Sequence, residues 1–345
     1  MSISITGTGA VSPAGWGVDS LMNALRSGAE IPPTLLDRTS AGTRIQTPVL
    51  RVPTDGATTP KFPRLRRTSP ISKFAAAAVA EALGEERLEA VTAGNLRVGV
   101  IFTLINGCVN YSNRFFGEAL AEPALASPIL FPETVFNAPS SHLSAMIGSH
   151  SPNDTLIGDS TGFFSGIDLA AEWITRGEVD GCLVVSGEEI DWLSAEGLRH
   201  YSRNYRTSEG AAAVYLEAAE GSAKILRLPD PVSLGANSRV TAARKVREML
   251  CANDDGSTLL VDGQAGVRRY DSPEITAWAD WTGPRWSPRI VLGEGMGVSA
   301  ALQVVAAVEA LKSGDFHQAV VTTTGANQHA AGILLGSPIG RSQLQ

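Results

Sequence analysis

The sequence predicts an α/β protein built from two similar halves, and two observations support this fold class. The first is an internal repeat, because residues 174–187 (ITRGEVDGCLVVSG) resemble residues 310–325 (ALKSGDFHQAVVTTTG). Each copy contains a helix end, a glycine followed by an acidic residue, and a strand that ends in glycine. The second is that both strands are rich in valine and uninterrupted, which is typical of strands covered on both faces. Duplication of a βαβ-type half explains both observations.

The segments that precede the repeated strands match as well. Residues 162–173 (GFFSGIDLAAEW) and 295–310 (GMGVSAALQVVAAVEA) each place small residues ahead of an apolar helix. In the second segment the apolar side chains recur at the 3.6-residue spacing of a helix. They are Ala301, Val304, Val305, Val308 and Leu311. We therefore expect the order strand, tight turn, helix and strand in both halves.

The other elements can be placed from periodicity and turn residues. They are a β-rich opening at 2–15, a helix at 19–26, an irregular excursion at 31–70, a helix at 72–83, a strand at 96–103, a turn and helix within 131–148, a strand at 154–160, a helix at 166–176, and strands at 182–186, 211–219 and 257–263. The segment 226–290 is otherwise expected to be rich in loops. We place the boundary between the halves so that they span residues 1–225 and 226–345.

Composition excludes several classes of protein. A net charge of −7 gives no indication of nucleic-acid binding. The three cysteines lie far apart and form no CxxC motif, so neither a disulfide framework nor a metal site is predicted, and no cofactor is implied. The N-terminus lacks the features of a signal peptide, and the apolar run 74–83 is too short to span a bilayer. We expect a cytoplasmic protein without membrane insertion.

One alternative function is nucleotide binding, because Gly7-Thr8-Gly9 follow the first residues of a predicted strand. The dinucleotide fingerprint GxGxxG would require a glycine where this chain has Ser12. Glycines that serve the local backbone are the simpler explanation, so no nucleotide cofactor is expected.

The corner between the strand at 154–160 and the following helix has the form that enzymes use to expose a nucleophile. A tight strand-to-helix turn presents one side chain at the helix N-terminus, where the backbone N–H groups favour negative charge. Here the turn reads GDSTGFFSG (158–166), and its centre is Phe163-Phe164. Neither side chain can act as a nucleophile.

Taken together, several motifs resemble those of the β-ketoacyl synthases of the thiolase superfamily. The motifs are ITGTGAVSPAGWG (5–17), SGEE (186–189), SEGAAAVYLE (208–217) and the late glycine turn that opens the second of the repeated helices. The resemblance covers most of the chain. It implies a thiolase-like fold with the layers αβαβα, two pseudo-duplicated halves in one chain, and a dimer formed across strand 154–158.

The resemblance also implies which positions should carry the chemistry. The family's acyl-accepting Cys corresponds to Phe163, and its two His residues correspond to Asp262 and Glu294. The family's Lys corresponds to Arg289, and its gating turn corresponds to residues 324–327. Phe163, Phe164 and Gly325 are therefore candidates for the wall of an acyl tunnel.

Two functions remain open from these residues. In the first, the chain is a non-catalytic, chain-length-factor-like subunit of polyketide, aryl-polyene or fatty-acid-like assembly. Its partners would be an active ketosynthase, or a second copy of itself, and an acyl carrier protein. In the second, the chain is an enzyme that handles acyl thioesters through the carboxylates of Asp262 and Glu294. Ser160, Thr161 or Ser165 would then serve as a nucleophile, unless Arg268 and Arg269 neutralise the two acids.

Overall fold

The computed structural model describes residues 2–40, 42–54, 59–235, 238–326 and 328–337. The helices are α1 (Val18–Ser27), α2 (Pro70–Thr92), α3 (Val109–Ala121), α4 (Ala138–Ile147), α5 (Gly162–Thr175), α6 (Trp192–Tyr201), α7 (Arg239–Leu250), α8 (Arg268–Ala277), α9 (Pro288–Leu292) and α10 (Gly297–Lys312). The strands are β1 (Ser4–Ser12), β2 (Gly15–Trp16), β3 (Thr34–Ser40), β4 (Thr43–Leu50), β5 (Val98–Leu104), β6 (Asn153–Ile157), β7 (Gly181–Glu188), β8 (Thr207–Ser208), β9 (Gly210–Glu217), β10 (Ala223–Arg227), β11 (Val232–Ser233), β12 (Thr258–Val261), β13 (Arg285–Trp286), β14 (Gln318–Thr324) and β15 (His329–Gly336).

The strands form two sets of five with the same topology. The first set has the order β6-β5-β7-β9-β1, and the second has the order β13-β12-β14-β15-β10. In each set the first two neighbouring pairs are parallel and the last two are antiparallel. The sets join where β1 pairs with β10, at Ile5 and Ala223. This strand-by-strand equivalence confirms the predicted duplication.

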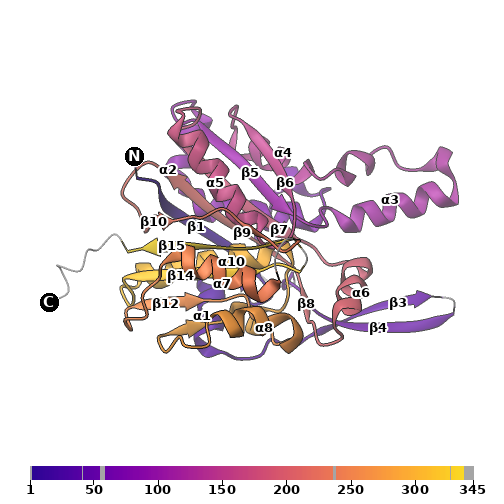
Figure 1. Ribbon diagram of the computed structural model, residues 1–345. Helices are drawn as coiled ribbons and strands as arrows, with labels where there is room; N and C mark the ends of the chain where they lie inside the picture. Colours follow the sequence, from indigo (N-terminus) through magenta and orange to yellow (C-terminus); the bar gives the residue numbers. More distant parts are fainter. Residues whose placement is uncertain (1, 41, 55–58, 236–237, 327, 338–345) are drawn as a thin grey trace.

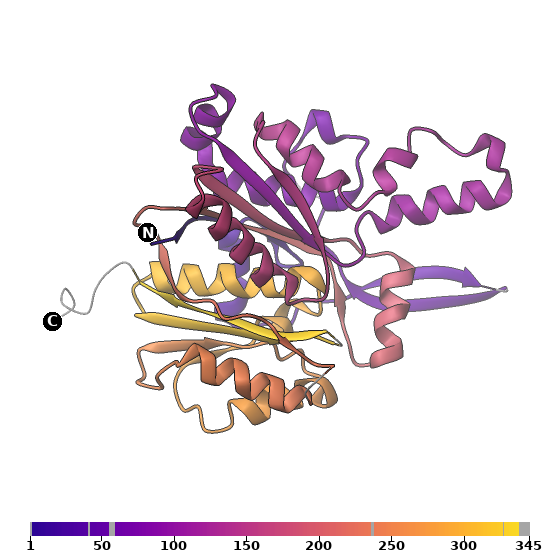
Figure 2. The same cartoon turned by 45° about the horizontal axis from the view of Figure 1, so that its top comes forward.

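Helices α5 and α10 occupy the layer between the two sets of strands (Figures 1 and 2). Helix α10 is buried along nearly its whole length and contacts β7 and β9 of the first half as well as β14 of the second. Helices α2 and α4 cover the outer face of the first half, and α7 and α8 cover that of the second. The layers therefore follow the order αβαβα, as the thiolase-like fold predicts.

Three elements differ from the expectations. The helix expected at 72–83 extends from Pro70 to Thr92, with a break in helical geometry at Gly84. The excursion at 31–70 contains the hairpin β3–β4 instead of irregular chain only. The segment 226–290 is not mainly loop, because it holds α7 and α8. The boundary placed between residues 225 and 226 falls inside β10 and stays a prediction.

Two segments project from the same side of the layered core, the hairpin β3–β4 and the stretch from α3 to residue 134 (Figures 1 and 2). Between residues 2 and 337, leaving aside the short gaps named above, no helix has the length and apolar character needed to cross a membrane.

Candidate functional site

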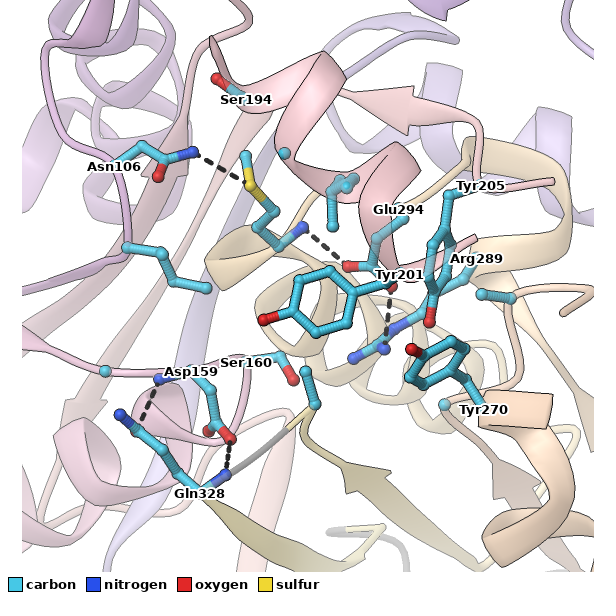
Figure 3. Close-up of a pocket in the computed structure, with 18 of the residues that line it drawn as sticks. Asn106, Asp159, Ser160, Ser194, Tyr201, Tyr205, Tyr270, Arg289, Glu294 and Gln328 are labelled. Atoms are coloured by element: carbon cyan, nitrogen blue, oxygen red, sulfur yellow. Dashed lines mark hydrogen bonds and ion pairs between the residues drawn. The ribbon is translucent and has the colours of Figure 1, made fainter. Parts of the chain in front are cut away.

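A cavity of about 560 Å³ lies where the two halves meet α6 and α8. Its wall includes Ser160 from the strand-to-helix corner, Tyr201 from α6, Tyr270 from α8, and Arg289 and Glu294 from the link that leads into α10 (Figure 3). The predicted corner and the late glycine turn thus meet at one site, although more than 120 residues separate them in the sequence.

The corner is fixed to the second half through Asp159. One oxygen of this carboxylate, Oδ1, accepts hydrogen bonds from the backbone N–H (3.0 Å) and the hydroxyl of Thr161. The other, Oδ2, accepts from the backbone N–H groups of Gln328 (3.2 Å) and His329 (3.3 Å). Gly325 lies against the same oxygen, because a Cβ at Gly325 would stand 1.9 Å from Oδ2. Glycine at 325 therefore allows the turn between β14 and β15 to close onto the corner.

The two phenylalanines of the corner point away from the cavity. Phe163 and Phe164 are each 1% exposed and belong to the apolar core between the sheets, together with Ile167 and Val298. Gly158, Asp159 and Ser160 are the corner residues that line the cavity, whereas Ser165 is exposed on α5. The assignment of Phe163, Phe164 and Gly325 to an acyl tunnel stays a prediction.

Glu294 is held by an arginine and by the start of α10. Its Oε1 accepts from the backbone N–H of Met296 (2.7 Å) and from the hydroxyl of Ser299 (3.0 Å), and its Oε2 lies 3.2 Å from Nη1 of Arg289. Arg289 also donates to the hydroxyl of Thr323. Both charged side chains are less than a tenth exposed, so the pair balances its own charge inside the protein.

Asp262 does not line the cavity. Its carboxylate is fully buried and accepts from Gln264 through both the backbone N–H (3.0 Å) and the side-chain amide (2.8 Å). It also accepts from the hydroxyl of Ser287 (2.8 Å) and pairs with Arg285 (2.5 Å). Arg285 and Arg289, and not Arg268 and Arg269, are therefore the arginines that pair with the two acids. Of the three positions matched to the family's Cys and two His, only Glu294 reaches the cavity.

The opposite wall is aromatic, and the sequence did not reveal it. The rings of Tyr201 and Tyr205 lie 6.0 and 5.4 Å, centre to centre, from the ring of Tyr270. The guanidinium of Arg239 lies 5.2 Å from the centre of the Tyr270 ring (Figure 3 shows the tyrosines). Tyr201, Tyr205 and Tyr270 were visible in the sequence, but they belong to segments for which no element had been predicted.

Residues 1–222 match the family described as Beta-ketoacyl synthase, N-terminal domain. The chain belongs to the beta-ketoacyl synthase family. No curated protein sequence matches it.

Solved structures of similar fold include ketosynthases and their complexes. The ishigamide ketosynthase/chain length factor has a TM-score of 0.80 and 19% identity, with coverage of 99% of this chain and 100% of that one. The ketosynthase ApeO in complex with its chain length factor ApeC from Xenorhabdus doucetiae has a TM-score of 0.80 and 13% identity, with coverage of 97% and 98%. AntDE:AntF, a type II polyketide synthase acyl-carrier protein in complex with its ketosynthase, has a TM-score of 0.77 and 17% identity, with coverage of 97% and 99%. This likeness supports the thiolase-like fold.

Within this beta-ketoacyl synthase fold, the described part of the chain places no cysteine and no histidine in the cavity wall. Cys108 and Cys182 are buried elsewhere, and burial raises the pKa of both thiols above its usual range. Cys251 is exposed at the end of α7. A cysteine thiolate is therefore not available at this site.

The glycines at 7 and 9 are explained by packing. Both lie inside β1, and an added Cβ would stand 1.9 Å from the carbonyl oxygen of Ala82 or of Ala78 in α2. They permit α2 to approach the strand closely.

Over the described ranges, no group of three or more His, Cys, Asp or Glu side chains has the arrangement of a metal site.

Replacing Arg289 with methionine is expected to lower the free energy of unfolding by about 3 kcal/mol, because it leaves the Glu294 carboxylate buried without its cation. The double variant Arg289→Met/Glu294→Gln should recover most of this loss, as measured by urea denaturation. Arg176→Met serves as a control, since Arg176 pairs with Glu172 in solvent, where such a pair contributes less than about 1 kcal/mol. Equal losses in Arg289→Met and Arg176→Met would contradict the description of the buried pair.

Proposed function

We propose that the chain is a non-condensing subunit of the beta-ketoacyl synthase family that pairs with an active ketosynthase in polyketide, aryl-polyene or fatty-acid-like assembly. One observation carries the proposal: the cavity at the corner has neither a thiol nor an imidazole in its described wall. A covalent acyl-enzyme needs a thiolate or a hydroxyl activated by an adjacent base, and the enolate that follows needs hydrogen-bond donors. A phenyl ring forms no thioester, and the carboxylate of Glu294 offers no N–H of the kind that an imidazole would donate to an enolate oxygen.

The correspondence of Phe163, Asp262 and Glu294 to the family's Cys and two His is part of this proposal. Phe163 and Phe164 fill the start of α5 from the core side. We therefore propose that the two rings block entry of an acyl group at the corner, so that the partner subunit holds the growing acyl group. The arginine partners of Asp262 and Glu294 disfavour the alternative in which these acids perform acid–base chemistry.

The exposed surface also has features of a protein–protein interface, which supports the proposal of a partner subunit. Exposed apolar side chains gather on the projecting segment that begins with α3, and they include Phe116, Leu120, Leu125, Ile129 and Phe131. Ile157, at the end of β6, is 60% exposed, and among the strands of the described residues β6 pairs with β5 alone, which makes it an edge strand. Exposed apolar patches and free strand edges are features of protein interfaces. The similar structures that are named as ketosynthase and chain length factor complexes make an active ketosynthase the proposed partner.

An acyl carrier protein is the second proposed partner, because one similar structure contains such a protein with its ketosynthase. These partners would place the chain in the cytoplasm. A homodimer of the chain would use the same apolar surface when no ketosynthase is present.

The test is co-expression with a ketosynthase of the family that retains the Cys and both His residues, followed by co-purification and mass spectrometry of products formed from acyl and malonyl carrier proteins. We expect the two chains to co-purify, the complex to form carbon–carbon bonds, and the isolated chain to form none. Leu120→Asp should disrupt the complex, whereas Met249→Asp, on a partly exposed residue of α7, should not. Condensation by the isolated chain at the rate of an active ketosynthase would contradict the proposal.

A further inference from the structure

Of the two arginines in the described cavity wall, Arg239 and Arg289, Arg239 is the one without a carboxylate partner. It begins α7, lines the cavity, and forms no ion pair with any carboxylate in the described ranges. Its Nη2 donates to the carbonyl oxygen of Gly325 (3.1 Å), and its Nε is buried and has no acceptor. The Nε of Arg289, which is 6% exposed, also lacks an acceptor. Buried donors normally have partners, so two unused guanidinium N–H groups in one wall indicate a missing acceptor.

The acids of the wall are already satisfied. Glu294 is paired with Arg289, and Asp159 accepts four hydrogen bonds. Asp271 accepts from the backbone N–H of Ala265 (2.9 Å), and burial raises its pKa. The unused hydrogen-bonding capacity of the cavity is therefore on the donor side, which favours a ligand that supplies acceptor oxygens.

The rest of the wall defines the body of such a ligand. Tyr201, Tyr205 and Tyr270 supply aromatic faces, and the apolar side chains that line the cavity include Ile105, Val109, Leu193, Leu198 and Met296. A volume of about 560 Å³ lies within the usual range for small organic molecules, which bind in mostly apolar cavities with a few polar contacts. A ligand with an apolar or aromatic body and one polar head matches a wall that is mostly apolar and has its unused hydrogen-bond donors on the arginines.

We propose that the cavity binds a small organic carboxylate, with its head on Arg239 and its apolar or aromatic body against the tyrosines. The planar guanidinium matches a carboxylate in charge and geometry. A dianion such as a phosphate fits less well, because one unpaired cation cannot offset the cost of removing two charges from water. The site is a property of this chain alone, so its test is separate from the test of the ketosynthase partnership.

Isothermal titration calorimetry of the isolated chain tests the proposal with two acids, cinnamate and octanoate, and their amides. We expect at least one acid to bind at one site about 10-fold or more tightly than its amide. Arg239→Gln should weaken binding of that acid by about 10-fold and leave binding of the amide unchanged. Arg269→Gln is the matched control, because Arg269 also lies over the Tyr270 ring (5.8 Å) but is exposed and does not line the cavity.

The comparison of acid and amide on the unaltered chain stands even if Arg239→Gln does not fold. Equal affinities for acid and amide would overturn the proposal, as would the absence of binding by both acids at about 10 mM. An equal loss of affinity in Arg269→Gln and Arg239→Gln would also overturn it, since the effect would then come from net charge.

Discussion

Replacing Gly9 with alanine is expected to lower the free energy of unfolding by about 4 kcal/mol or more, or to prevent folding. A Cβ at this position would lie 1.9 Å from the carbonyl oxygen and 2.8 Å from the carbonyl carbon of Ala78. Both atoms belong to the backbone of α2, so no side-chain rotation can relieve the clash, and the helix must move away from β1. Because α2 and β1 share the core that includes Val11 and Ala82, the shift would open packed contacts. Urea denaturation measures the loss.

Gly117→Ala is the matched control for this substitution. Gly117 lies inside α3, and no atom stands within 4 Å of a Cβ added there. Alanine favours helix more than glycine does, so this variant should gain about 0.5 to 1 kcal/mol. If the free energy of unfolding of Gly9→Ala lies within about 1 kcal/mol of the value for the unaltered chain, α2 does not pack against β1 as closely as described.

The fold could be predicted from the sequence because its duplication is visible in the chain itself. The repeated segments became α5 with β7 and α10 with β14. Both helices are apolar because they lie between two sheets. Since the same burial applies to both, their sequences still resemble each other, and this resemblance reveals the repeat. The equivalence of β1 and β10 was not visible, because β10 has five residues and shares no pattern with β1.

The helices of the second half were missed for a different reason. Helix α7 carries four arginines or lysines in RVTAARKVREML, so its mean hydropathy is low. Its buried stripe of Ala242, Val246 and Leu250 recurs every four residues, and Ser238 accepts a hydrogen bond from the backbone N–H of Thr241 (3.1 Å) as an N-cap. Both signals were present in the sequence. Helix α8 was harder to foresee, since it contains Pro273.

The site was only partly predictable, because similarity aligns positions along the chain and does not fix where side chains point. Ser160 and Glu294 reach the cavity from the two segments that the sequence singled out. Phe163 comes from the same corner and Asp262 from the end of the predicted strand at 257–263, but both are buried and do not line the cavity. Tyr201, Tyr270 and Arg239 lie on α6, α8 and α7. A local pattern can predict such helices, but their position beside the corner depends on tertiary packing, so the sequence could not place these side chains in one wall.

Glu188 is expected to make the folded chain less stable as the pH rises from about 5 to about 8. It ends β7 and is fully buried, and its carboxyl accepts from the backbone N–H groups of Ile105, Asn106 (3.2 Å) and Gly297 without any cation. Burial raises the pKa of Glu188 from its ordinary value of 4.5 to about 8. Between these values the unfolded chain releases a proton that the folded chain keeps, so stability falls with pH by roughly 4 to 5 kcal/mol in total.

The variant Glu188→Gln isolates this contribution from those of the other buried acids. Denaturation of both proteins at several pH values should show that the variant lacks the decrease assigned to Glu188. Below about pH 4.5 the carboxyl is protonated in both states and the two curves should run parallel. Glu86→Gln, on the exposed side of α2, should keep the full pH dependence of the unaltered chain. Parallel curves for the unaltered chain and Glu188→Gln from about pH 5 to about 8 would mean that the three backbone N–H groups compensate the buried charge, and that Glu188 is ionised in the folded protein.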